Sequence, residues 1–341
     1  MIKIFLGFAS LVLGFAILGI VISSIGVGEI VRIFLQFSPW GIIPLVVLTF
    51  LGHIVSAMKW QYILASFGIR AQFMPLLKMW LAGYAISYLT PVAYIGGDFF
   101  RSNMLRERYG VSWPRALSSV FIDKTLEAAI WISVILVGAA VFVYQSGISS
   151  VSGYMEAAIV AVIVFGVFLT VVYIFVFQRK SLVRILFLKP FKFENSAVDK
   201  FLSDIEKDFF DFFSFSNRKY ILGAMKITIL KYIILWIRNI FLIFYLVKVF
   251  SLSASLMALG FSYLSYLAPV PAAIGVQEGL LSLVFSGVGF GASMGAVFSL
   301  LFRGAESIMV ALGIFFLFRW GLSRFILRIS KLLRPLLAKK Q

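Results

Sequence analysis

The chain has 341 residues, of which 62% are hydrophobic and only 13% are charged, and its mean hydropathy is +1.03. These values exclude a soluble globular domain and predict an integral membrane protein. The net charge of +17 fits basic cytoplasmic loops and contact with anionic headgroups, so nucleic acid is not an expected partner, and the absence of cysteine excludes disulfides and thiolate metal sites.

Apolar runs long enough to cross about 30 Å of hydrocarbon set the expected spans. They cover 4–25, 39–67, 116–144, 154–177, 220–249 and 292–318. No small-residue cleavage site follows the first run, so we expect a retained span and not a signal peptide. Two further apolar segments, 75–95 and 255–287, are interrupted by prolines, which end helices.

The treatment of these two interrupted segments decides the topology. If both cross, the chain has eight spans and its basic segments fall on opposite sides of the membrane. If both dip in and return, six spans remain, and the segments 70–115, 179–219 and 319–340, rich in Lys and Arg, share one side. The positive-inside rule favours the second topology, with both termini cytoplasmic, in the cell membrane. We therefore predict an all-α polytopic protein with six spanning helices and two re-entrant segments.

A short pattern occurs twice in the chain. Residues 88–98 read YLTPVAYIGGD, and residues 266–278 read YLAPVPAAIGVQE. In the six-span topology the regions 39–144 and 220–318 run in opposite senses, which predicts an inverted repeat within a single transporter domain, 1–320. Non-helical backbone at membrane depth is tolerated only where protein or water covers it, so the two breaks are expected to face each other across a cavity.

Two segments have the pattern of amphipathic helices. The first covers 195–213, within a linker over 189–217, and is expected to lie on the cytoplasmic membrane surface. The second covers 322–337 in the basic C-terminal tail, 321–341. It suits either anionic headgroups or positive-inside anchoring.

Charged residues inside the spans are the candidate substrate-binding groups, because each costs about 2.5–3.5 kcal/mol near a helix centre and tends to face protein or water. They are Asp123, Lys124 and Glu127 in one span, Arg303 and Glu306 at the corresponding place in another, and Arg238 deep in 220–249. Two interpretations stay open. The charges form salt bridges three residues apart that lower the cost of insertion, or Lys124 and Arg303 present charge to an anionic headgroup.

The two breaks supply the candidate gates. Asp98 and Glu278 follow glycines in the first turn of a helix, where a carboxylate is favoured, so they either cap the helix or contact a cationic group. The expected gating residues are the helix-ending prolines and the glycines that permit turns: Pro91, Gly96, Gly97, Pro269, Pro271 and Gly275. The open amides of these half-helices are suited to phosphate.

One family shares this order of motifs. The residues are Lys59-Trp60, Pro91, Gly96-Gly97-Asp98-Phe99-Phe100-Arg101, Asp123-Lys124, and Pro269 followed by Gly275-Val276-Gln277-Glu278-Gly279. The pattern resembles the membrane region of lysylphosphatidylglycerol synthases and related stand-alone proteins, including the membrane part of an archaeal dolichol-phosphate glycosyltransferase. Fuller members add a soluble aminoacyl-transferring domain, whereas the membrane domain is implicated in moving lipids between leaflets. This sequence has no such soluble domain, so the resemblance implies translocation and not synthesis.

We therefore predict a flippase-type transporter, not an enzyme, for an anionic or phosphate-containing lipid such as a phospholipid or a polyprenyl-phosphate-linked lipid. Arg101, Lys124 and Arg303 would recognise phosphate. No Walker motif, metal site or cofactor motif is present, so movement is facilitated or ion-coupled, and a homo-oligomer is compatible with the sequence.

Two alternatives remain. One is an integral membrane transferase acting on a lipid carrier, which would need a general base and usually a metal. The single histidine, His53, lies in an apolar run and is interpreted as a core residue, and no paired-aspartate or histidine cluster occurs. The other alternative is a small-solute or ion carrier with the same repeat architecture.

Overall fold

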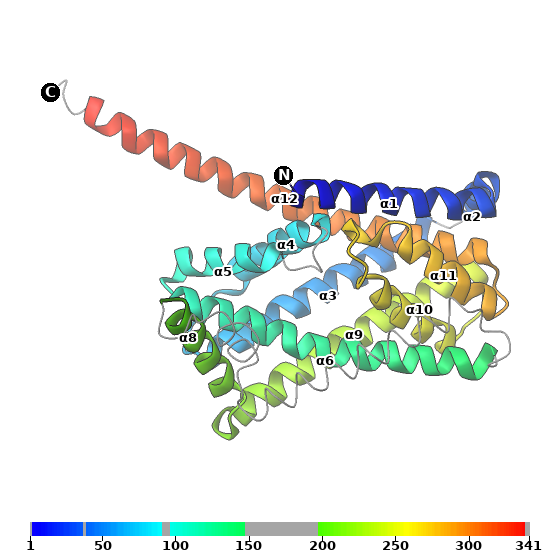
Figure 1. The fold of residues 1–341 in the computed structure, drawn as a ribbon, viewed down its shortest axis with the longest axis horizontal. Helices are drawn as coiled ribbons and strands as arrows, with labels where there is room; N and C mark the ends of the chain where they lie inside the picture. The colour runs from blue at the N-terminus through cyan, green and yellow to red at the C-terminus, as the bar shows by residue number, and fades with distance from the viewer. Residues whose placement is uncertain (1, 37–38, 91–95, 147–196, 338–341) are drawn as a thin grey trace.

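The computed structural model describes residues 2–36, 39–90, 96–146 and 197–337, and these residues form helices joined by short links, without strands (Figure 1). In chain order the helices are α1 (Ile2–Ile25), α2 (Val27–Gln36), α3 (Pro39–Ser66), α4 (Phe73–Leu89), α5 (Gly96–Tyr109), α6 (Trp113–Ser146), α8 (Ala197–Phe212), α9 (Arg218–Val247), α10 (Leu252–Ser265), α11 (Val276–Gly287) and α12 (Ala292–Leu337). Two short 3₁₀ turns, η3 (Phe215–Asn217) and η4 (Pro271–Ala273), precede α9 and α11.

Four helical stretches are long and apolar enough to cross a membrane: 40–66, 113–145, 215–247 and 292–320. A fifth span results if α1 and α2, which meet at an angle of 83°, are taken together. These stretches coincide with four of the predicted spans, the run 4–25 falls in α1, and the run 154–177 lies outside the described residues. The chain is thus a multi-pass membrane protein whose described residues form an all-helical fold.

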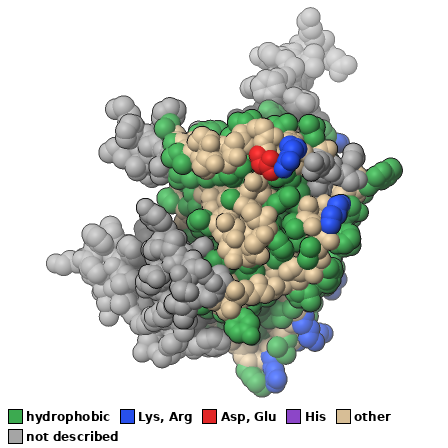
Figure 2. Space-filling view, turned by 90° about the vertical axis from the view of Figure 1, so that its right-hand side faces the viewer, with side chains coloured by type: hydrophobic (Ala, Val, Ile, Leu, Met, Phe, Trp, Pro, Cys, Tyr) green, Lys and Arg blue, Asp and Glu red, His purple; other side chains and the backbone are tan. Residues whose placement is uncertain are grey.

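Helix α9 illustrates how the surface and the interior divide. Ile229, Ile233 and Ile237 recur every four residues and are exposed, whereas Thr228 and Leu235 on the opposite face are buried. An exposed apolar stripe on a long helix is what contact with lipid tails favours. Figure 2 shows one face of the molecule on which hydrophobic and uncharged side chains cover most of the described surface.

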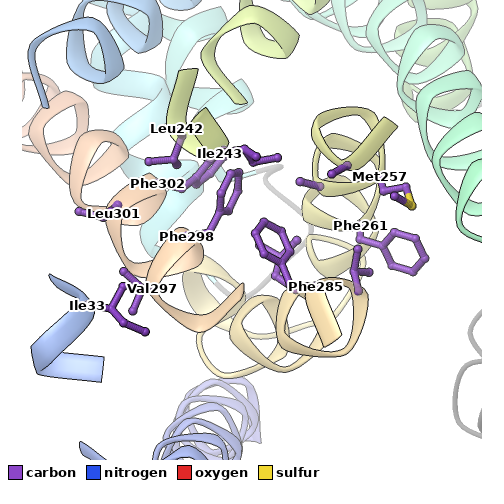
Figure 3. Packing of buried hydrophobic residues seen from close by; sticks show 14 of the residues in the cluster. Ile33, Leu242, Ile243, Met257, Phe261, Phe285, Val297, Phe298, Leu301 and Phe302 are labelled. Atoms are coloured by element: carbon purple, nitrogen blue, oxygen red, sulfur yellow. The ribbon is translucent and has the colours of Figure 1, made fainter. Parts of the chain in front are cut away.

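The largest apolar core lies among α9, α10, α11 and α12 (Figure 3). Phe298 occupies its centre, with ring centroids 5.3 Å from Phe285 and 6.5 Å from Phe302. Leu242 from α9 and Met257 from α10 are buried in the same cluster. A second core surrounds the fully buried Trp60 of α3 and joins α4, α5 and α6. These two cores fix the helices that carry the charged side chains.

The first break falls between α4 and α5. Helix α4 ends at Leu89, and α5 begins at Gly96, while Pro91 lies outside the described residues. A Cβ atom at Gly97 would overlap the backbone oxygen of Gly83, so only glycine lets α5 cross α4 this closely.

The second break contains strained backbone. Ala272 and Ala273 in η4 have φ angles of 53° and 51°, in the left-handed region that costs a residue with a Cβ about 1–2 kcal/mol, and Gly275 follows with φ 80°. Ala272 packs with Ala85 and Tyr88 from the end of α4. The start of the first break and the centre of the second therefore lie against each other.

Helix α8 covers the predicted amphipathic segment but packs against protein. Ile205 and Phe212 are buried, and Phe212 shares a cluster with Ile122 of α6 and Ile63 of α3. Part of its apolar side thus contacts the bundle, and its predicted place at the membrane surface stays a prediction. The predicted tail helix, 322–337, is the continuation of α12, which extends beyond the bundle (Figure 1). The side chains of that extension lie outside the described part of the chain.

Candidate functional site

A network of charged side chains crosses the interior of the bundle between α5 and α9. At its centre Asp123 of α6 is fully buried, with Lys59 Nζ 2.8 Å from one carboxylate oxygen and Arg101 Nη2 3.0 Å from the other. Lys59 Nζ also donates to Glu127 at 2.9 Å, and Glu127 accepts a further bond from Lys231 of α9. Three helices besides α6 thus supply cations to the acids of α6.

On the side away from Lys231, this network reaches the first break, between α4 and α5. Asp98, in the first turn of α5, lies 3.7 Å from Arg101 and 3.6 Å from Lys124 Nζ. The Lys124 side chain is 38% exposed, more than any other member of the network. Among the described residues the network joins four cations to three carboxylates, and Lys124 is its most exposed cation.

Two indole rings hold the guanidinium of Arg101. Its Cζ atom lies 4.5 Å from the ring centroid of Trp60 and 4.1 Å from that of Trp80. A planar, weakly hydrated guanidinium suits such stacking, whereas an ammonium would keep less of it. The Trp60 Nε1–H donates to Ser119 at 3.2 Å, and the Trp80 Nε1–H donates to His53 Nδ1 at 3.2 Å. Trp80 therefore connects Arg101 to a second polar group.

That second group is centred on Glu306 of α12. Its Oε1 accepts from Arg238 at 2.8 Å, and its Oε2 accepts from the Tyr84 hydroxyl at 2.8 Å and lies 3.5 Å from His53 Nε2. Arg238 also donates to Thr49 at 3.1 Å. The deep Arg238 thus has its carboxylate partner on another helix, and His53, predicted as an ordinary core residue, is buried between Trp80 and Glu306.

Arg303 holds the second break together. Its guanidinium forms a pair with Glu278 at 2.7 Å and donates to the backbone oxygens of Ala272 at 2.5 Å and Ala273 at 3.3 Å. The Glu278 carboxylate accepts in turn from the Gly275 N–H at 2.8 Å. Arg303 therefore binds the carbonyls of the two strained residues, while its role at a headgroup stays a prediction.

The ion pairs also differ from the predicted pairs three residues apart on one helix. Lys124 faces Asp98 and not Glu127, and Glu306 binds Arg238 and not Arg303. Each partner lies on a different helix, so these pairs fix how helices pack. Of the predicted gating residues, Gly97, Pro271 and Gly275 are buried at the breaks, Gly96 is half-buried at the start of α5, and Pro269 is exposed.

Sequence reasoning gave no site role to several residues that the networks contain: Lys59, Lys231, His53, Trp80 and Tyr84. The cost of a charge within an apolar run, applied to the run 39–67, would have selected Lys59. Nothing in the sequence pattern distinguishes Trp80 from other aromatic residues in spans. Across the described ranges, no three His, Asp or Glu side chains are grouped to hold a metal ion.

Comparison with known proteins identifies the family. Residues 7–313 match the family model described as the lysylphosphatidylglycerol synthase TM region. The chain belongs to this family. The resemblance inferred from the motifs is thereby confirmed.

Two curated relatives are membrane proteins of archaea. A UPF0104 membrane protein of Methanocaldococcus jannaschii is 26% identical over 307 residues, covering 86% of this chain and 88% of the relative. A UPF0104 membrane protein of Methanothermobacter thermautotrophicus is 31% identical over 117 residues, covering 34% of this chain and 35% of the relative. No solved structure matches the chain.

Proposed function

We propose that the protein is a flippase-type transporter that moves an anionic or phosphate-bearing lipid between membrane leaflets, without catalysing a reaction. The observation that carries the proposal is the network of charges inside an apolar bundle, ending at the half-exposed Lys124 beside the first break. Buried charges are costly in membranes, and function is the usual reason for keeping them. Membership of a family named for the membrane region of a phospholipid synthase agrees with a lipid substrate.

The headgroup enters at Lys124 and Asp98. Their charged atoms are 3.6 Å apart, longer than the 2.7–2.9 Å typical of a charge-assisted hydrogen bond. A lipid phosphate takes the place of the Asp98 carboxylate against Lys124 and Arg101, because it offers the same charge with more acceptor oxygens. The lipid tails stay in the hydrocarbon while the headgroup passes through the polar interior.

The transporter consists of two inverted repeats. Helix α3 packs on α9, and the contact of α4 with α12 is matched by the contact of α10 with α6. One constant offset of 179 residues gives network residues of one half a counterpart of like type in the other half: Thr49 and Thr228, Lys59 and Arg238, Tyr84 and Tyr263, Lys124 and Arg303, Glu127 and Glu306. Matching contacts between matching residues support a duplicated unit.

The two breaks act as gates between the halves. Helices α4, with 17 residues, and α10, with 14, are shorter than the about 20 residues that span a bilayer, which supports re-entrant segments and six crossings. In this topology both termini are cytoplasmic, and the protein lies in the cell membrane. Rocking of one repeat against the other exposes the network first to one leaflet and then to the other.

Liposomes test the proposal. Purified protein is reconstituted with a fluorescent anionic phospholipid, and bleaching of the inner-leaflet lipid by an impermeant reductant is followed over time. We expect faster bleaching than in protein-free liposomes, and a rate about ten- to a hundred-fold lower for Lys124→Gln, since a lost charge-assisted hydrogen bond costs about 1.5–3 kcal/mol.

The matched control is Lys226→Gln, which removes an exposed lysine of α9 outside the network. It should keep the wild-type rate. Equal rates for wild type and Lys124→Gln would contradict a headgroup site at Lys124. Bleaching no faster than in protein-free liposomes would contradict the proposed function itself.

A further inference from the structure

His53 is the single histidine of the chain, and its surroundings define its neutral form. The Trp80 Nε1–H can only donate, so His53 Nδ1, 3.2 Å away, must accept and carries no proton. The proton of the neutral imidazole is therefore on Nε2, which faces Glu306 Oε2 at 3.5 Å. The hydrogen-bond partners thus fix one tautomer.

A second proton on this imidazole would have a defined structural effect. It must go to Nδ1, and Nδ1–H would then oppose the Trp80 N–H, donor against donor. The contact of Nε2–H with Glu306 would be strengthened, because the Glu306 carboxylate is already placed to accept from an imidazolium. Protonation therefore breaks the bond to Trp80 while keeping the contact with Glu306.

The groups around His53 determine how it responds to pH. Among the described residues, the titratable and charged groups that face it are Glu306 from α12, Tyr84 from α4 with ring centroids 4.4 Å apart, and, through Glu306, Arg238 from α9. When His53 is charged, the Glu306 carboxylate therefore pairs with two cations, His53 and Arg238. An imidazole changes charge between about pH 5 and 8, whereas guanidinium and phenol groups do not.

Trp80 transmits this change to the headgroup site. Its ring is one of the two that hold Arg101, at 4.1 Å, and its N–H is anchored by His53. Loss of the anchor frees the indole to turn, which loosens Arg101 from its stack and makes its guanidinium available to a phosphate.

We propose that His53 is a proton-binding site, and that proton binding there releases Trp80 and thereby Arg101. The assignment of Arg101 to a headgroup rests on the proposed function, whereas the proton site and the Trp80 contact do not. At the same offset that relates the two networks, the second repeat holds Tyr232 in place of His53, and the Tyr232 ring lies 5.3 Å from that of Tyr263. A phenol there does not take up a proton in this pH range, so only one half carries the site.

The proton site can be tested without transport. Untagged protein labelled with ¹⁵N at its one histidine and at its tryptophans gives an imidazole spectrum from a single residue together with the indole resonances. We expect the Nε2–H tautomer at about pH 8, a protonated ring at about pH 5, and a shift of the Trp80 indole resonance with the same midpoint. The Trp80 resonance is identified by its absence in Trp80→Phe. An Nδ1–H tautomer, a ring that stays neutral down to pH 5, or an unmoved Trp80 resonance would each overturn the proposal.

Transport then tests the coupling to Arg101. His53→Gln keeps both hydrogen bonds of the neutral form, because its oxygen accepts from Trp80 and its amide donates to Glu306, but it takes up no proton. We expect wild-type bleaching to accelerate about two- to ten-fold from pH 8 to pH 5, the scale of one lost hydrogen bond, and the variant to show a flat profile. A flat wild-type profile, a slowing at low pH, or the same acceleration in the variant would overturn the coupling.

Trp80→Phe separates the two parts of the proposal. It keeps an aromatic ring beside Arg101 and removes the N–H, so His53 should still titrate while the transport rate no longer follows pH. A rate that still follows the His53 titration would show that Trp80 does not carry the signal. If the wild-type protein moves no lipid at any pH and the spectral changes are as expected, the proposed function fails and the proton site remains.

Discussion

Removing the charge of Asp123 should cost more stability than any exposed ion pair of this protein. Asp123→Asn keeps the shape of the side chain but leaves Lys59 and Arg101, both almost fully buried, facing a neutral amide. Breaking a buried pair by removal of one partner costs about 3–5 kcal/mol. Two cations lose a partner here, but Lys59 keeps Glu127 and Arg101 keeps both indoles. We therefore expect a decrease of about 3–5 kcal/mol in the free energy of unfolding.

The control is Asp208→Asn on α8. Asp208 pairs with Arg115 at 3.3 Å, and the Arg115 side chain is 48% exposed, so the pair contributes about 0–1 kcal/mol. Both variants are unfolded reversibly by titration with a denaturing detergent, and loss of helix is followed by circular dichroism. If Asp123→Asn costs no more than Asp208→Asn, the network does not stabilise the bundle, and the reasoning from buried charge is wrong.

The two breaks allow backbone substitutions that are read by the same unfolding measurement. Gly97→Ala forces a Cβ atom onto the backbone oxygen of Gly83 and should cost about 3 kcal/mol or more of unfolding free energy. The control, Gly304→Ala, places its Cβ where nothing lies within 4 Å and should change stability by less than about 1 kcal/mol. Similar values for the two would contradict the close crossing of α4 and α5. Ala272→Gly removes a left-handed alanine at φ 53° and should stabilise the protein by about 1 kcal/mol. Ala258→Gly inside α10 should instead destabilise it by about the same amount. A lower free energy of unfolding for both variants would contradict strain in η4.

The fold class was predictable because apolar length is a strong signal. The runs 39–67, 116–144, 220–249 and 292–318 correspond to α3, α6, α9 and the first part of α12. Hydropathy has no information on which protein surface an apolar face contacts, so the packing of Ile205 and Phe212 of α8 on the bundle was not predicted. The extent of α12 was also missed, since a change from apolar to basic composition does not require a helix to end.

Some residues of the candidate site were predictable from the sequence, but their contacts were not. The cost of a charge inside a span selects Asp123, Lys124 and Glu306 from sequence alone. Their partners are set by helix packing, so Glu306 pairs with Arg238 from 68 residues away and not with its neighbour Arg303. Arg303 pairs with Glu278 and donates to the carbonyls of Ala272 and Ala273 in η4, where both residues have left-handed backbone. Sequence spacing contains no information about such acceptors.

Under the proposed repeat, the differences between the halves carry more functional information than their likeness. Lys59 and Glu127 have equivalents in Arg238 and Glu306, so this pair is common to both halves and fits a role in holding helices together.

Asp123 and Arg101, in contrast, have no charged equivalent in the second half. Phe302 stands at the position equivalent to Asp123, and Leu281 follows Glu278 as Arg101 follows Asp98. Both replacements are buried in the apolar core of Figure 3. If that repeat holds, apolar packing at these positions is enough to join the helices, because the second half has it. A role in helix packing alone therefore does not account for Asp123 and Arg101, and their place beside the half-exposed Lys124 supports the proposed binding site for an anionic headgroup.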